Sequence, residues 1–308
     1  MKLVRYLPLM LLAACFQACG DRMIKNKQTD SVENTVQQVV QPIERKVNHV
    51  LQVEYTEDLI GDWVGMFEPD TAYMNADEER GSLSHKITIS IDQINGTEVK
   101  GHSVVAGNYR PFTGTVEDEE KKFVFTVAEP GDDQFDGKFD FTIPKGDSLL
   151  IGGWKSYKEI KIPARNYKLN KRFFKYDPQR KLEDFPYVNW KKSKQQEQDY
   201  DGEKSMEEAF YSTTEDVRKY NPSTQELKRE NVANMKKADI YILRNSIFAR
   251  HGFSFKNKDL MTYFDMQEWY MPVSINIEKN LTALEKKNIN LLMKYEKHAE
   301  EYYDVFGR

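Results

Sequence analysis

The side chains best suited to chemistry lie close together near position 250. Arg244, Arg250 and His251 stand within one short stretch, and the spacing of Arg244 and His251 places both on one face of a helix. Two guanidinium groups and an imidazole could bind an anion or transfer a proton. In the structural interpretation, the arginines pair with Glu or Asp of neighbouring helices and His251 bonds helix-end carbonyls. We favour this interpretation and predict no catalytic residue.

The other candidate residues form no recognised catalytic or metal-binding pattern. The five histidines lack metal-ligand spacing, and no cysteine pair is spaced for zinc. Ser103 follows His102 but lacks the second glycine of a nucleophile elbow, and Walker A and Rossmann glycine motifs are absent. We therefore expect no metal, no cofactor and no enzymatic activity. A carboxylate pair that cleaves glycosides ranks last among the alternatives.

The composition limits the class of protein. The 308 residues suffice for about two domains, and 31% of them are charged. The net charge of −4 argues against a dedicated nucleic-acid binder, which normally carries a basic excess. Two cysteines are too few for a scaffold held by disulfides.

Residues 55–178 carry the alternation of β-strands. Apolar residues alternate in runs such as Ile87–Ile91 and Phe123–Val127, and turn-forming pairs such as Asn95-Gly96 separate the runs. No helix-length apolar period interrupts them. We predict eight or nine strands that form an antiparallel barrel or a sandwich.

The opening of this region, Leu59–Gly65, carries Gly61-Asp62-Trp63. It resembles the Gly-x-Trp start of lipocalin-like barrels, in which the tryptophan closes one end. The resemblance implies a barrel able to enclose one small apolar ligand. The alternative, which we favour, is a barrel filled by its own Phe, Ile and Trp side chains.

A basic stretch ends the β-rich region. Residues 155–175 contain eight Lys or Arg and only Glu159 of the opposite charge, with aromatic residues such as Phe173 and Phe174 between them. We interpret these cations as solvated strand edges that prevent pairing with other sheets. The alternative is a basic stripe that meets an anionic envelope polymer or lipid headgroup.

Residues 179–235 read as a polar connector with partial helix. Residues 191–199 are strongly polar and should be exposed or disordered. Ser205-x-x-Glu208 and Ser223-x-x-Glu226 have the spacing of capping boxes, and each predicts a helix start.

Residues 236–308 have the apolar period of helices. Ile240 and Leu243 lie on one face, Gly252 provides a helix stop, and Asn257 and Thr282 begin two further helices. The stretch Leu243–Phe255, together with Trp269-Tyr270, resembles the YARHG domain of bacterial extracytoplasmic proteins. The resemblance implies a small helical module of no established activity, and it brings no catalytic residue. Its motif positions, which we expect to be structural, are Arg244, Asn245, Phe248 (Tyr in the family name), Ala249, Arg250, His251, Gly252, Trp269 and Tyr270.

The N-terminus reads as a secretory signal. Lys2 and Arg5 precede a short apolar run, and Leu12-Ala13-Ala14-Cys15 resembles the lipobox of bacterial lipoproteins. The resemblance implies cleavage before Cys15 and acylation of its thiol, with Cys19 as the alternative site. Acyl chains would then anchor the chain stably in a membrane.

These observations predict an α+β multidomain protein, an antiparallel β-barrel or sandwich followed by a small all-α C-terminal domain. The expected segments are a signal peptide (1–14), a flexible tether (15–54), the barrel (55–178), the connector (179–235) and the helical domain (236–308). We expect a lipid-anchored cell-envelope lipoprotein, favouring the outer membrane, that acts as a non-enzymatic binding module. Its partners would be the membrane, through the acylated cysteine, and an unidentified envelope protein or polymer, but no nucleic acid. The alternative is a carrier or sensor of a small apolar ligand.

Overall fold

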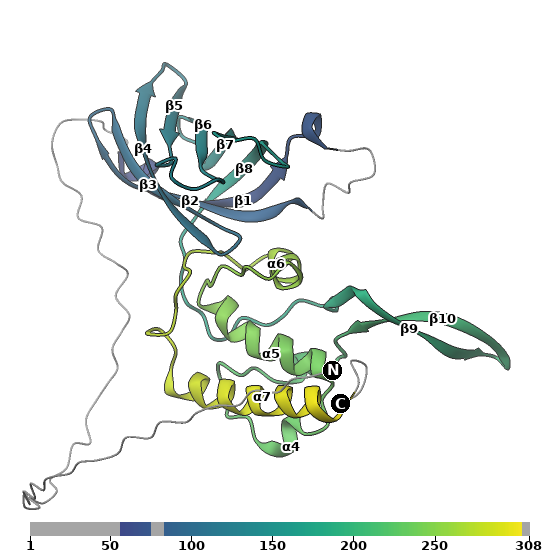
Figure 1. The fold of residues 1–308 in the computed structure, drawn as a ribbon. Coiled ribbons are helices and arrows are strands. Elements are labelled where there is room, and N and C mark those ends of the chain that lie inside the picture. Colours follow the sequence, from purple (N-terminus) through teal and green to yellow (C-terminus); the bar gives the residue numbers. More distant parts are fainter. Residues whose placement is uncertain (1–55, 75–82, 304–308) are drawn as a thin grey trace, which may run out of the picture. The chain divides into compact units, whose positions relative to one another are not determined.

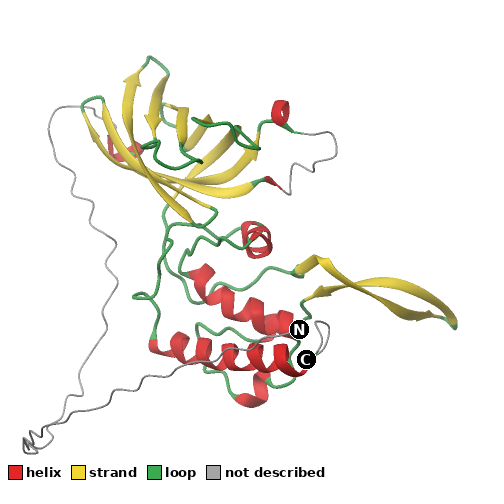
Figure 2. Ribbon diagram, viewed as in Figure 1, coloured by secondary structure: helices red, strands yellow, loops and turns green. Residues whose placement is uncertain are grey.

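The structure, a computed structural model, describes residues 56–74 and 83–303. These residues form a β-barrel, a two-stranded ribbon and a group of helices (Figures 1 and 2). The predicted signal peptide, both cysteines and the tether lie outside the described residues. None of the described helices is long and apolar enough to cross a membrane.

Eight antiparallel strands close into a barrel in chain order, and β8 pairs with β1 to complete the ring. The short helix α1 (Thr56–Leu59) precedes β1, and the 3-10 turn η1 (Thr71–Tyr73) follows it. The strands confirm the predicted antiparallel architecture and identify it as a barrel. They are β1 (Gly61–Pro69), β2 (His85–Asn95), β3 (Glu98–Val105), β4 (Asn108–Asp118), β5 (Lys122–Ala128), β6 (Gly137–Pro144), β7 (Leu149–Ser156) and β8 (Ala164–Arg172).

Aromatic side chains occupy the barrel interior. The ring of Phe67 lies 5.7 Å from that of Trp154 and 5.9 Å from that of Tyr167, and Phe139 lies 6.1 Å from Tyr167. Trp63 is fully buried, and its Nε1 donates to the carbonyl oxygen of Leu59 in α1 at 3.2 Å. The barrel thus contains a core of its own side chains, which agrees with the filled interior that we favoured.

A carboxyl group is buried beside this core. Glu129, directly after β5, is 4% exposed and accepts hydrogen bonds from the Gly137 amide at 2.7 Å, from Trp154 Nε1 at 3.3 Å and from Ser103 Oγ at 3.2 Å. Burial raises the pKa of Glu129 to about 7, although these hydrogen bonds act in the opposite direction.

The second hydrophobic core belongs to the helices. The long helices α5 and α7 run beside each other (Figure 1). A buried cluster that includes Leu243, Phe264 and Leu292 fills the space among the helices and their connecting segments. The helices are α3 (Asp216–Lys219), α4 (Arg229–Val232), α5 (Lys237–Arg250), α6 (Lys258–Asp265) and α7 (Ala283–Tyr302).

The predicted ends of these helices are confirmed. Gly252 has φ +71°, the left-handed conformation that ends α5. The side chain of Asn257 accepts from the Leu260 amide at the start of α6, and Thr282 forms a reciprocal capping box with Glu285 at the start of α7.

Both helix starts predicted in the connector are wrong. Ser205 lies in a β-ribbon formed by β9 (Val188–Tyr200) and β10 (Glu203–Ser212), where it pairs with Gln198. The turn between these strands contains Asp201 and Gly202, both at positive φ, as a tight hairpin turn requires. Ser223 lies in a turn, in which its amide donates to the Asn221 side chain, and α4 begins only at Arg229.

The barrel and the helices belong to one compact unit and are joined by polar contacts. The Lys86 amide in β2 donates to Asp265 Oδ2 at 3.0 Å. Lys86 Nζ donates to the carbonyl oxygens of Gln267 at 2.9 Å and Tyr270 at 3.2 Å. Burial raises the pKa of Asp265 to about 7 and lowers the pKa of Lys86 to about 8, because both groups are removed from water at this contact.

The buried Glu129 makes stability depend on pH. Its pKa in the folded chain is above the ordinary value of 4.5, so the folded state retains a proton that the unfolded state loses. The free energy of unfolding should therefore fall as the pH rises from about 4.5 to about 7. Glu129→Gln should remove this part of the pH dependence, as measured by urea denaturation across that range. If the wild type and this variant show the same slope, Glu129 titrates normally; Glu117→Gln, at an exposed site in β4, is the control.

Candidate functional site

The candidate residues lie at the C-terminal end of α5, where the chain turns sharply. The His251 amide donates to the Phe248 carbonyl oxygen, and Gly252 follows at positive φ. A Cβ on Gly252 would lie 2.5 Å from Val273 and 2.8 Å from Phe174. Both the backbone conformation and the available space therefore require glycine at this position.

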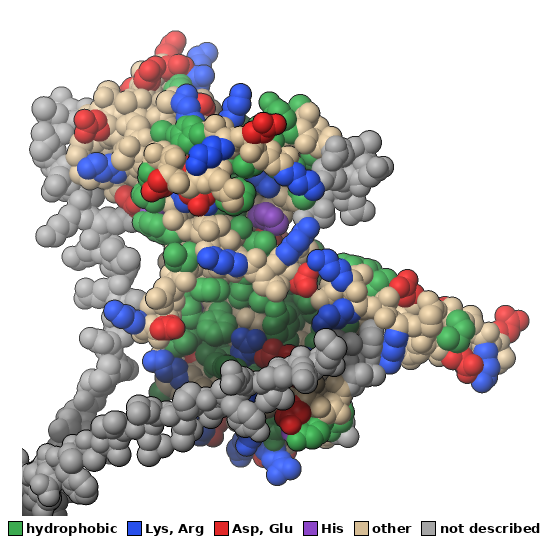
Figure 3. Space-filling view, in the orientation of Figure 1, with side chains coloured by type: hydrophobic (Ala, Val, Ile, Leu, Met, Phe, Trp, Pro, Cys, Tyr) green, Lys and Arg blue, Asp and Glu red, His purple; other side chains and the backbone are tan. Residues whose placement is uncertain are grey.

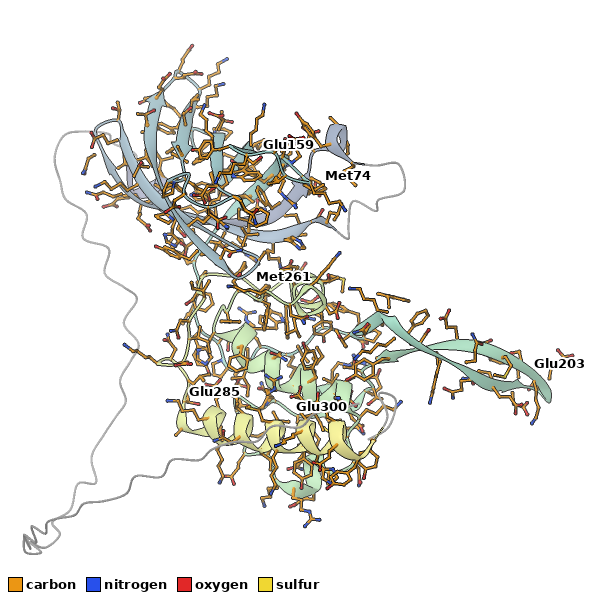
Figure 4. All side chains as sticks on the ribbon, in the orientation of Figure 1. Met74, Glu159, Glu203, Met261, Glu285 and Glu300 are labelled. Carbon is orange, nitrogen blue, oxygen red and sulfur yellow. The ribbon has the colours of Figure 1, made fainter. Side chains whose placement is uncertain are left out.

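His251 contributes to a buried network around Glu285. Its Nε2 lies 2.9 Å from Glu285 Oε2, and the two side chains are 4% and 0% exposed. The Tyr176 hydroxyl donates to Glu285 Oε1 at 2.9 Å, and its ring stacks on the His251 ring at 4.1 Å. The Thr282 amide donates to Glu285 Oε2 at 3.0 Å. Figure 4 labels Glu285 at the start of α7.

This network holds Glu285 as a carboxylate. Burial acts to raise the pKa of Glu285, but hydrogen bonds from His251 and Thr282 outweigh it and lower the pKa to about 2. Neither His251 nor Glu285 is open to solvent. The pair thus joins the end of α5 to the start of α7.

The two arginines have different surroundings. Arg244 makes a two-point ion pair with Glu296 of α7, at 2.8 and 3.2 Å, as predicted. Arg250 donates instead to two neutral oxygens, the Arg180 carbonyl and Ser246 Oγ, each at 2.8 Å. The predicted carboxylate partner of Arg250 is therefore wrong for the described residues. The prediction for His251 is also corrected, because its side chain bonds a carboxylate and not a helix-end carbonyl.

The other motif residues are mostly structural. Asn245 Nδ2 donates to the Tyr241 carbonyl oxygen at 2.8 Å, Ala249 is buried, and the half-buried ring of Phe248 lies 6.0 Å from that of Phe253. Tyr270 is 2% exposed, and its hydroxyl donates to the Phe253 carbonyl oxygen at 2.7 Å. Trp269 packs edge-on against Tyr270, but its Nε1 is buried without a hydrogen-bond partner among the described residues.

A cavity of about 140 Å³ lies beside this motif. Arg250 and Trp269 line it from the helical region, Arg172 lines it from the end of β8, and Lys175 lines it from the segment that follows β8. In the sequence, the basic stretch at residues 155–175 and Arg250 of the motif are separate features. Their convergence depends on the fold of the chain between positions 175 and 250, and no local pattern could have revealed it.

The buried carboxylate should stabilise the chain. Glu285→Gln removes the charge that pairs with His251 and should lower the free energy of unfolding by about 3 kcal/mol at neutral pH. Because the pKa of Glu285 is about 2 in the folded chain and ordinarily 4.5, this stabilisation is present above about pH 4.5 and is lost toward pH 2. Urea denaturation at neutral and acidic pH would measure both effects. Glu278→Gln, at an exposed site, is the matched control, and an equal effect of the two substitutions would contradict the prediction.

Comparison with known proteins identifies the helical region. The YARHG domain family matches residues 217–297, which extend from α3 to near the end of α7. Neither the curated proteins nor the solved structures yield a match. The match includes His251 and Glu285 and excludes Tyr176, Lys175 and the barrel. Residues 217–297 therefore form a YARHG domain, a module typical of extracytoplasmic proteins.

Proposed function

We propose that this protein is a lipid-anchored lipoprotein of the cell envelope that acts as a non-enzymatic interaction module. The YARHG domain supports an extracytoplasmic location. The sequence Leu12-Ala13-Ala14-Cys15 supports lipid attachment at Cys15, with Cys19 as the alternative. Acyl chains on this cysteine would hold the barrel and the helices at a membrane surface.

The β9–β10 ribbon is the observation that carries the interaction role. The two strands pair with each other and with no other described strand. The ribbon extends away from the helices (Figure 1) and exposes Trp190 (71%), Tyr200 (61%) and Met206 (63%). An isolated two-stranded ribbon is only marginally stable in water, and its outer edges present unpaired backbone groups. Both properties suit a surface that is covered by a partner.

The charge of the ribbon indicates the chemistry of that partner. Its outer half, residues 195–208, is acidic, with Lys204 as the one basic residue. Glu203 marks the end of the ribbon in Figure 4, and acidic side chains are visible there in Figure 3. We infer that the partner is an envelope protein with a basic, extended segment, which can add a strand to the ribbon. The acidic residues are Glu197, Asp199, Asp201, Glu203, Glu207 and Glu208.

The carrier alternative has less support. Rings of Phe67, Phe139, Trp154 and Tyr167 contact one another in the barrel interior, where an apolar ligand would have to bind. The buried state of His251 and Glu285 likewise supports a role without catalysis.

Lipid attachment predicts the location of the chain in fractionated cells. Cys15→Ala should move the protein from the membrane fraction to the soluble fraction, because the acylated thiol is lost. Cys19→Ala is the matched control and should leave the protein with the membrane. The opposite pattern would place the acyl group on Cys19, and release by neither variant would contradict the lipid anchor.

The interaction role predicts specific cross-links from the ribbon in intact cells. A photo-reactive amino acid in place of Trp190 or Met206 should give one discrete adduct with another protein. The same amino acid in place of Ile151, exposed on β7, should not give it. Glu203→Lys with Glu207→Lys should abolish the adduct by reversing the charge, whereas Glu117→Lys with Glu120→Lys on the barrel should preserve it.

Two results would contradict this partner. An adduct of twice the chain's mass would show that a second copy covers the ribbon. An adduct that survives charge reversal on the ribbon would exclude recognition of a basic segment.

A further inference from the structure

The cavity beside the motif has an excess of positive charge. Its lining contains four cations, Arg172, Lys175, Arg180 and Arg250, and one acidic residue, Asp177. Asp177 is already engaged, because Arg180 Nε lies 3.1 Å from its Oδ2. The Arg172 side chain donates to the Glu268 carbonyl oxygen at 2.9 Å, which leaves its charge uncompensated by that contact.

Arg250 is the deepest of these cations. It is 4% exposed, and its two hydrogen bonds go to neutral oxygens from Nε and Nη1. Within residues 56–74 and 83–303 it makes no ion pair. The carboxylates that act electrostatically on Arg250, Glu285 and Asp177, are engaged with His251 and Arg180 respectively. A buried guanidinium without a carboxylate is unfavourable unless an anion compensates it.

Trp269 adds a second, independent observation. It lines the cavity, and its Nε1 is buried with no hydrogen-bond partner among the described side chains and backbone. A buried indole N–H normally has an acceptor, and leaving it unpaired is costly. An acceptor oxygen that comes within hydrogen-bond distance of this nitrogen would satisfy it. Lys175 also lines the cavity and has no ion pair within the described chain.

We propose that this cavity binds a small oxyanion, a carboxylate or a phosphate group, held by Arg250, Lys175 and the Trp269 N–H. A volume of about 140 Å³ is close to that of cavities that hold a benzene-sized molecule, so one such group fits with few further atoms. Arginine suits both carboxylate and phosphate because its planar fork can donate two parallel hydrogen bonds. The methionine side chain of Met271 supplies an apolar wall for the remainder of the ligand.

The site does not depend on the ribbon or on the lipid anchor. Its lining comes from the end of β8, from the segment that follows the barrel and from the helical region. An anion bound there would be a ligand distinct from the partner of the ribbon. A bound anion would also stabilise the folded chain, since it binds a site that the unfolded chain lacks.

Isothermal titration calorimetry of the full chain in detergent tests the proposal. Sodium phosphate and sodium acetate are titrated separately at constant ionic strength, so that general screening does not change. At least one of them should bind with a saturable isotherm and a Kd of about 1 mM or tighter. Phosphate binding alone identifies a phosphate site, and acetate binding alone identifies a carboxylate site.

Variants link the binding to the cavity. Lys175→Gln should weaken binding about tenfold, because one charge-assisted hydrogen bond is lost. Trp269→Phe keeps a ring but removes the N–H donor, and it should weaken binding about threefold. Lys294→Gln, at an exposed site on α7, should bind as the wild type does. Both test variants leave the bonds of Arg250 to Arg180 and Ser246 in place, and thermal denaturation without ligand checks their folding.

Two outcomes would overturn the proposal. One is the absence of saturable binding for both anions. The other is equal affinity in Lys175→Gln, Trp269→Phe and Lys294→Gln, which would place any bound anion elsewhere on the chain.

Discussion

The helical region depends on one buried carboxylate. Glu285 accepts hydrogen bonds from Thr282 at the start of α7 and from Tyr176 in the segment after the barrel, and it pairs with His251 at the end of α5. Tyr176 and His251 lie far from Glu285 in the sequence, and His251 and Glu285 would each be a buried polar group in need of a partner if the other were absent. A network of this kind is favourable only when all its members are present, because a partly satisfied buried charge is costly. Glu285 therefore makes the turn after α5 and the start of α7 mutually dependent. Gly252 allows this arrangement, since a side chain there would collide with Phe174 and Val273.

The sequence predicted those strands and helices in which buried apolar side chains recur at a regular spacing. Alternation in segments such as Ile87–Ile91 places one side of each strand in the barrel interior, and this pattern led to the antiparallel barrel. The end of α5 and the starts of α6 and α7 were predicted because Gly252, Asn257 and Thr282 each end or cap a helix through backbone atoms only a few residues away.

The β9–β10 ribbon was missed because both its faces are largely exposed, and an exposed strand has no apolar alternation to detect. The Asp201-Gly202 pair was the sequence signal for a hairpin turn. The capping-box spacing at Ser205 led instead to the prediction of a helix start.

The contacts of the site residues could be predicted from the sequence only where a side chain has one usual kind of partner. Arg244 needed an acidic residue on a neighbouring helix, and Glu296 supplies it. The surroundings of Arg250 could not be deduced in this way, because one of its two hydrogen-bond acceptors is the Arg180 carbonyl oxygen, seventy positions earlier in the chain. The cavity has the same origin: Arg172 at the end of β8 and Lys175 after it meet the motif at the end of α5 only in the folded chain. The matched family domain contributes Arg250 and Trp269, while Arg172 and Lys175 come from outside it. The architecture of this chain, and not the domain alone, assembles the lining.

The base of the β9–β10 ribbon has a consequence for how this protein can evolve. The Thr213 amide donates to the Tyr187 carbonyl oxygen, and the Tyr187 amide donates to Thr213 Oγ1, so the two ends of the ribbon are fastened to each other. Tyr187 and Tyr211, next to these two hydrogen bonds, are buried in the helical core. Residues 191–208 of the ribbon are largely exposed, so this part can lengthen, shorten or change charge at a small entropic penalty for loop closure and without disturbing the core. The outer part of the ribbon can therefore be exchanged as one unit, while the hydrogen bonds at its base and the helical core keep the rest of the fold unchanged.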